Sequence, residues 1–94
     1  MKIKNSNIFE KKWVILIIKA LLEKDKNFST MRREISGISD KVLSQRLLEM
    51  EKAEILKRYV YTGIPVRVEY GLTGKGRNLK KVVSELTLWS NAYM

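Results

Sequence analysis

The sequence predicts a mainly α-helical domain with one small β-hairpin, in the element order α-α-α-β-β-α. Apolar residues recur at helical spacing in the early, middle and late parts of the chain, whereas residues 57–70 alternate between polar and apolar. Glycines and the single proline separate these stretches. The 94 residues are enough for one domain with a modest core, which we place at residues 8–94 behind a flexible basic arm at residues 1–7.

The first helix is expected over residues 8–22. Its apolar positions at helical spacing are Phe9, Trp13, Leu16, Ile17, Ala20 and Leu21. Val14, Ile15 and Ile18 make the helix apolar nearly all round, which is typical of a helix that is buried on more than one side. The run Trp13–Ile18 is much shorter than a membrane span, and no signal-peptide cleavage pattern follows it. We therefore interpret this helix as buried, with a partner subunit as its second wall.

A short second helix is expected to end at Ile35, with Ser29 or Thr30 as its cap. A minimal strand near Phe28 is a further possibility. A turn follows, in which Gly37 can adopt a positive φ angle without a steric penalty.

The third helix is expected to begin at Ser39 or Asp40, because both residue types cap helices and a carboxylate favours the positive end of the helix dipole. The apolar residues that define the buried face of this helix are Leu43, Leu47 and Met50. Leu48 either widens this face or lies outside it.

Two antiparallel strands are expected over residues 57–62 and 66–70, because apolar or aromatic residues alternate with polar ones in both. The segment Gly63-Ile64-Pro65 forms the tip between them. Thr73 is expected to cap a last helix after the second strand. The apolar residues that keep helical spacing in it are Leu79, Val82, Val83, Leu86 and Trp89.

This order of elements is typical of a winged helix-turn-helix, in which the third helix enters the major groove of DNA. Such a helix buries one face and turns small polar and basic side chains outward. Gln45 suits a bidentate contact to adenine, and Lys41 suits guanine or phosphate. The alternative is an ordinary solvated helix face. The candidate base contacts in the first two turns are Ser39, Lys41, Ser44 and Gln45.

The hairpin would serve as the wing, with Arg58 and Arg67 as its DNA contacts. The two arginines project a double positive charge from one surface if the turn register places both on one face. The alternative is a routine exposed hairpin in which Glu69 neutralises Arg67. The second helix would cross the DNA backbone. Its candidate phosphate contacts are Thr30, Arg32 and Arg33.

The role of Arg46 is open at the level of sequence. It lies beside the buried face of the third helix, so an ion pair with Glu49 or Glu34 competes on equal terms with a DNA contact.

Composition favours a polyanionic partner and argues against an enzyme. The chain has 19 Lys and Arg against 10 Asp and Glu, a net charge of +9 that suits a nucleic acid or an anionic membrane surface, although solubility alone could explain it. No cysteine and no histidine are present, which removes thiolate nucleophiles, Cys-ligated zinc and the usual general base. The segment Thr73-Gly74-Lys75-Gly76 lacks the spacing of a Walker loop. We therefore expect no catalytic residues, metal or cofactor.

Four phrases follow one another between Lys12 and Trp89: KWVILII, NFSTMRREISGISDKVLSQRLLEMEKAEILKR, IPVRVEYGLTGKGRNL and the closing LW. Together they resemble the HxlR-type transcriptional regulators, a branch of the MarR-like winged-helix proteins. The resemblance implies a cytoplasmic homodimer that binds a two-fold symmetric operator, with dimer contacts from the first and last helices. Several relatives sense electrophiles or oxidants through a cysteine near the start of the first helix. This chain has no cysteine, so that mechanism does not transfer to it.

The expected function is therefore sequence-specific binding of double-stranded DNA by a homodimeric transcription regulator. A winged-helix protein-interaction module that does not bind DNA is the alternative. A membrane-surface role is weaker, because the first helix lacks a clean polar face. The candidate dimer-interface residues are Trp13, Ile17, Leu86 and Trp89. The alternative role of these four residues is to line an apolar pocket for a small-molecule effector, although no motif supports an effector.

Overall fold

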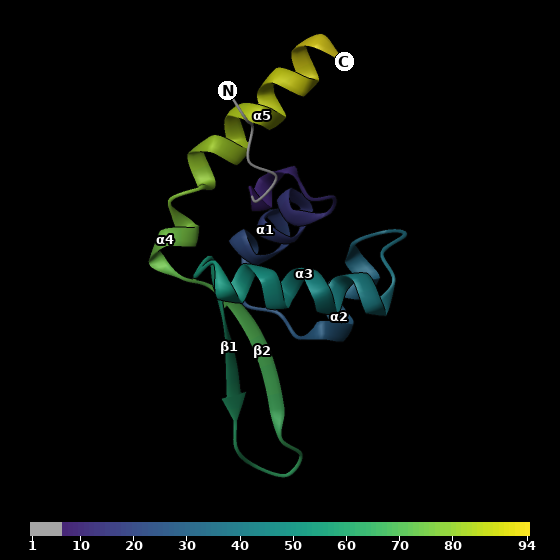
Figure 1. The fold of residues 1–94 in the computed structure, drawn as a ribbon, viewed down its shortest axis with the longest axis vertical. Coiled ribbons are helices and arrows are strands. Elements are labelled where there is room, and N and C mark those ends of the chain that lie inside the picture. The colour runs from purple at the N-terminus through teal and green to yellow at the C-terminus, as the bar shows by residue number, and fades with distance from the viewer. Residues whose placement is uncertain (1–6) are drawn as a thin grey trace.

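The structure, a computed structural model, describes residues 7–94 and confirms the predicted element order. In Figure 1 the helices that precede the hairpin gather at the centre, the hairpin extends from one end and the last helix from the other. The predicted arm lies outside the described residues except for Asn7, whose side chain accepts a hydrogen bond from the backbone N–H of Phe9 at 2.9 Å. The elements are the 3₁₀ helix η1 (Ile8–Glu10), α1 (Val14–Glu23), α2 (Phe28–Glu34), α3 (Asp40–Lys52), β1 (Leu56–Tyr61), β2 (Arg67–Leu72), α4 (Gly74–Arg77) and α5 (Lys80–Tyr93).

One apolar core joins the three central helices to the root of the hairpin and to α5. The predicted buried face of α3 is confirmed, and Leu48 leaves that face with 53% of its surface exposed. The buried apolar residues are Val14, Ile17, Ile18, Leu21, Met31, Ile35, Ile38, Leu43, Leu47, Met50, Ile55, Leu56, Leu72 and Val83.

The first helix is shorter than predicted. The 3₁₀ helix η1 occupies the start of the predicted range, and α1 begins only at Val14 because Trp13 adopts a left-handed backbone conformation with φ of 83°. A bulky residue adopts this conformation only where its surroundings hold it there. The Trp13 ring packs against the turn at Gly37, where an added Cβ would lie 3.6 Å from the ring. Packing between distant residues thus overrides the local helical periodicity.

Polar contacts connect α3 to the segment that precedes α1. The Glu49 carboxylate pairs with the Lys11 ammonium and with Nη1 of Arg46 at 2.9 Å, while Nε of Arg46 donates to the Lys12 carbonyl at 3.0 Å. The hydrogen bond from Lys11 lowers the pKa of Glu49, burial opposes this in part, and the hydrogen bond from Arg46 adds to the lowering. Arg46 is therefore a structural residue that pairs with Glu49, which resolves the alternatives that the sequence left open.

The second helix starts earlier than predicted. Its cap is Asn27, whose side-chain oxygen accepts a hydrogen bond from the Thr30 backbone N–H at 2.8 Å. The prediction of Ser29 or Thr30 as the cap is wrong. Asn caps a helix as well as Ser does, and Asn27 precedes both predicted residues in the sequence. Phe28 is the first residue of α2, and the extended pairing near it is a single bridge formed by Lys26. The turn after α2 is as predicted, with Gly37 at φ of 88°.

The C-terminal helical part is divided into α4 and α5, where the sequence predicted one helix. Thr73 caps α4 as expected: its hydroxyl accepts from the Gly76 N–H at 3.0 Å and donates to the Glu54 carbonyl at 2.6 Å. Gly76 lies so close to the backbone of Ile55 that an added Cβ would be 2.1 Å from the carbonyl oxygen. These contacts fix α4 against the segment after α3, and α5 begins separately at Lys80.

The buried face of α3 can be tested with two neighbouring leucines. Leu47 is 2% exposed, so Leu47→Ala should lower the free energy of unfolding by about 2–5 kcal/mol. Leu48→Ala, at a side chain that is 53% exposed, should change it by about 0.5 kcal/mol or less. Urea unfolding followed by circular dichroism measures both. Equal losses in the two variants would contradict the assigned face.

The ion pairs of Glu49 should make part of the stability depend on pH. Because its pKa is lowered in the folded protein, this contribution is complete above the ordinary carboxyl pKa and is lost as the pH falls through the lowered value. Glu49→Gln should therefore cost at most about 1 kcal/mol at pH 7, and the difference should shrink below roughly pH 4. Urea midpoints across this range measure it, with Glu51→Gln on the same helix as the control. A difference that does not change with pH would refute the assignment.

Candidate nucleic-acid interface

The outer face of α3 presents a stripe of exposed side chains. Lys41, Ser44, Gln45 and Leu48 follow at positions i, i+3, i+4 and i+7, which places them along one side of the helix, and all four are exposed. Ser39 differs, because its hydroxyl caps α3 by accepting from the backbone N–H of residue 42 at 3.1 Å. Leu48 is the member of the stripe that the sequence-based set omitted. Its spacing from Ser44 is the signal that could have placed it there.

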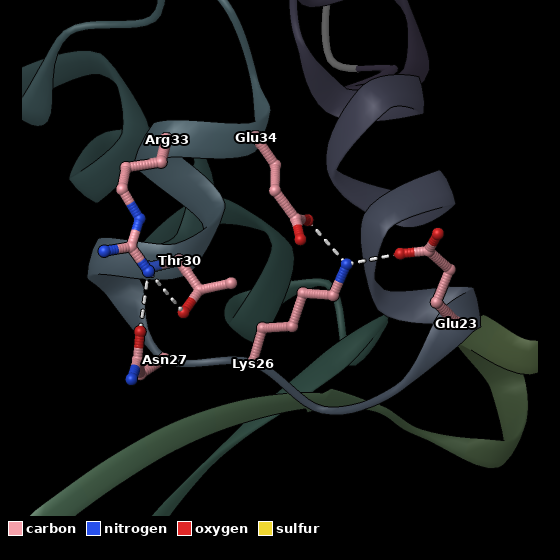
Figure 2. A network of polar contacts seen from close by, with 6 residues as sticks. All are labelled: Glu23, Lys26, Asn27, Thr30, Arg33 and Glu34. Carbon is pink, nitrogen blue, oxygen red and sulfur yellow. Dashed lines mark hydrogen bonds and ion pairs between the residues drawn. The ribbon is translucent and has the colours of Figure 1, made fainter.

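The predicted phosphate contacts on α2 are not equivalent. Arg32 forms an ion pair with Asp40 at the start of α3, so its charge joins the two helices of the helix-turn-helix. Arg33 is exposed, and its Nη2 lies 3.5 Å from the Thr30 hydroxyl, as Figure 2 shows. The long contact leaves the positive charge of Arg33 facing solvent. Arg33 is therefore better placed than Arg32 to meet a phosphate.

A buried lysine, absent from the sequence-based set, holds the helix-turn-helix to the wing. The Lys26 side chain is 1% exposed, and its Nζ lies 2.5 Å from Glu23 and 2.6 Å from Glu34, at the ends of α1 and α2 (Figure 2). Its backbone forms both hydrogen bonds of a single antiparallel bridge with Tyr70 of β2, at 3.0 and 2.8 Å. This bridge stands where the sequence predicted a minimal strand near Phe28.

The charge of Lys26 is stabilised despite its burial. Burial alone lowers the pKa of Lys26, but the hydrogen bonds to Glu23 and Glu34 outweigh it, so the pKa is raised above the ordinary value. The hydrogen bond from Lys26 in turn lowers the pKa of Glu23. Lys26 and Glu23 are therefore both ionised near neutral pH. No local pattern marks this cluster, because Glu34 comes from a different helix than Glu23.

The register of the hairpin places the two wing arginines on opposite faces. Arg58 lies opposite Tyr70, and Arg67 lies opposite Tyr61. Directly paired residues share a face and neighbours along a strand alternate, so Arg58 and Arg67 cannot share one. The sequence left open a hairpin register in which both arginines project from one face. The observed register excludes that surface of double positive charge. The Arg67 guanidinium lies 5.1 Å from the Tyr61 ring centre and 3.9 Å from Glu69, so Glu69 offsets its charge only in part.

A second surface, on α5, is apolar. Val82, Leu86, Trp89 and Tyr93 follow at i, i+4, i+7 and i+11, and all are about half or more exposed. The rings of Trp89 and Tyr93 lie 5.3 Å apart. We call this row the α5 stripe. A groove of about 230 Å³ adjoins it between α1 and α5, lined by Phe9, Ile15, Ile18, Leu79, Val82, Val83 and Leu86.

The four predicted interface residues separate into two kinds. Ile17 has no exposed surface and belongs to the core of a single protomer, and Trp13 is half-buried against the turn before α3. Leu86 and Trp89 are exposed on the α5 stripe. Only Leu86 of the four lines the apolar groove, so an effector pocket built from all four is not formed.

Two further observations concern the described part of the chain. None of its helices combines the length and the apolar character that crossing a membrane requires. Within residues 7–94, acidic side chains do not gather into a cluster that could hold a metal ion.

Comparison with known proteins agrees with this geometry. The HxlR-like helix-turn-helix family matches residues 8–94. The HTH-type transcriptional regulator YvaP of Bacillus subtilis (strain 168) is 38% identical over 88 residues, which cover 94% of this chain and 82% of that protein.

Solved structures share the fold. The reduced form of the transcriptional regulator YodB from B. subtilis is 38% identical and superposes with a TM-score of 0.84 over 92% of this chain and 84% of its own. A MarR-family protein of Porphyromonas gingivalis W83 is 27% identical, with a TM-score of 0.87 and complete coverage (100%) of both chains. All three relatives are named as transcriptional regulators. The chain belongs to the HxlR-like helix-turn-helix family of transcriptional regulators.

Proposed function

We propose that this protein is a homodimer in the cytoplasm and binds a two-fold symmetric operator in double-stranded DNA. The observation that carries the proposal is the division of α3 into two faces. One face is fully buried, and the other exposes Lys41, Ser44 and Gln45 on a rigid helix. A recognition helix needs this division, because its base contacts have to be held in place by the domain behind it.

Each exposed side chain of α3 has a chemical role in the proposed complex. Gln45 can donate to and accept from an adenine edge in the major groove, and Lys41 can reach guanine or phosphate. Leu48 is an apolar neighbour on the same side and suits a thymine methyl group. Arg33 and Arg67 approach phosphates, which fix the register of the protein without reading sequence. The net charge of +9 makes the binding strongly dependent on salt.

The dimer is proposed from the α5 stripe. Four large apolar side chains form one exposed row on a projecting helix, and rows of this kind commonly mark interaction surfaces. The adjoining groove between α1 and α5 is lined by apolar side chains alone and can accommodate apolar side chains from α5 of a partner subunit. In such a dimer the two α3 helices would enter successive major grooves roughly 34 Å apart.

Base reading by Gln45 can be measured by selecting binding sites from random duplexes. Gln45→Ala should relax the preference at one base pair in each half-site, by about 1–3 kcal/mol. Arg33→Ala is the control, because loss of a phosphate contact should weaken binding to all duplexes alike and reduce the salt slope by about one. An unaltered base preference in the Gln45 variant would remove that residue from the base-reading set. A wild-type protein without salt-sensitive DNA binding would refute the proposed function.

The dimer can be tested by sedimentation at micromolar concentration. The wild-type chain should sediment at twice its mass of 11.0 kDa. Trp89→Glu should sediment as a monomer, since it places a charge in the middle of the α5 stripe, and should bind a two-half-site operator at least roughly tenfold more weakly. Ser84→Glu, which adds the same charge off the stripe, should remain dimeric. A monomeric wild-type protein would refute this part of the proposal.

A further inference from the structure

The ammonium group of Lys26 is buried, whereas the two carboxylates that it contacts lie at the surface. The Lys26 side chain is 1% exposed, while those of Glu23 and Glu34 are 71% and 44% exposed. Both contacts are short, at 2.5 and 2.6 Å, and Figure 2 shows the ammonium group between the two carboxylates. The cluster therefore holds its cation in the interior of the protein and leaves its anions in contact with water.

Because of this asymmetry, the fold does not need the buried charge for its stability. Removal of an ammonium group from water is unfavourable, and ion pairs often do no more than compensate for that cost. In Lys26→Met the buried charge is lost while a long side chain still fills the space. Glu23 and Glu34 remain hydrated in this variant, since both are exposed. Lys26→Met should therefore be at least as stable as the wild-type protein.

The side chain and the main chain of Lys26 are attached to different elements. The side chain contacts Glu23 and Glu34, which are the last residues of α1 and α2. The main chain forms both hydrogen bonds of the bridge to Tyr70 in β2. Apolar packing between these elements is non-directional, so it holds them together without selecting one arrangement. The ion pairs require that Lys26, and with it β2, lies at one place relative to the end of α2.

We propose that Lys26 is a positioning residue for operator binding, whose charge fixes the hairpin relative to α2 and adds no net stability to the fold. This inference rests on the proposed function, in which Arg33 of α2 and Arg67 of β2 both approach phosphates. Two contacts on elements that are already fixed bind more tightly than two contacts on elements that must first be ordered. Lys26 acts through these arginines and not by contact, because its own side chain is 1% exposed.

The position of the hairpin can be measured without DNA, because the chain has no cysteine of its own. Ser36→Cys, just after α2, and Thr62→Cys, just after β1, provide two exposed sites for nitroxide labels. An excess of unlabelled chain leaves one labelled subunit in each dimer. Double electron–electron resonance should then give one narrow distance distribution with Lys26 in place. Lys26→Met should broaden or shift this distribution, at a urea midpoint equal to or above that of the wild type.

Operator affinity should follow the position of the hairpin and not the stability of the fold. On the duplex that the wild-type protein selects from random DNA, Lys26→Met should reduce affinity roughly tenfold. Lys24→Met is the matched control, because it removes the same charge from an exposed neighbour. It should keep the narrow distribution and reduce affinity much less. Arg67→Ala should weaken binding less in the Lys26→Met background than alone, because a displaced hairpin no longer delivers that contact.

The inference and the proposed function can fail separately. A lower urea midpoint of Lys26→Met would make Lys26 an ordinary stabilising residue and overturn the inference. An unchanged label distance, or an operator affinity of Lys26→Met equal to that of Lys24→Met, would also overturn it and leave the proposed function intact. Absence of DNA binding by the wild-type protein would overturn the proposed function and the role in operator binding. The label distances would then still decide whether the charge of Lys26 fixes the hairpin.

Discussion

The buried charge of Lys26 is the interaction on which the arrangement of the DNA-binding elements depends. An ammonium group removed from water costs several kcal/mol unless opposite charges and hydrogen bonds replace the lost hydration. Glu23 and Glu34 supply both, and they lie at the ends of α1 and α2. The two helix ends therefore have to meet at Lys26. Because the main chain of Lys26 pairs with Tyr70 in β2, the wing is joined at the same point.

The recognition helix separates stability from recognition on its two faces. Its inner face belongs to the core, and ion pairs hold it at two places, through Asp40 to Arg32 and through Glu49 to Lys11 and Arg46. The outer stripe takes no part in these contacts. The side chains that we propose to read DNA can therefore change without cost to the fold, which would allow one scaffold to serve regulators with different operators.

Charge and apolar surface are also distributed for different tasks. The excess of positive charge supplies long-range attraction to phosphates, which is independent of sequence and weakened by salt. The α5 stripe is apolar, and apolar contacts depend little on salt. In the proposed complex, the first kind of contact brings the protein to DNA. The second kind fixes the spacing of the two subunits.

The sequence by itself determined the element order, the buried face of α3, the turn at Gly37 and the cap at Thr73, and with them the family. These features follow from periodicity and capping over a few neighbouring residues, which the chain displays directly. Only the tertiary structure decided that Lys26 is buried between two helix ends, because its partners are brought together by folding. It also decided that Arg58 and Arg67 point to opposite faces, since a shift of one residue in the hairpin register exchanges the faces of a strand. The late start of α1 has the same origin, whereas α2 starts early because of the local cap at Asn27. Contacts between distant segments outweigh the small local preferences that a sequence reveals.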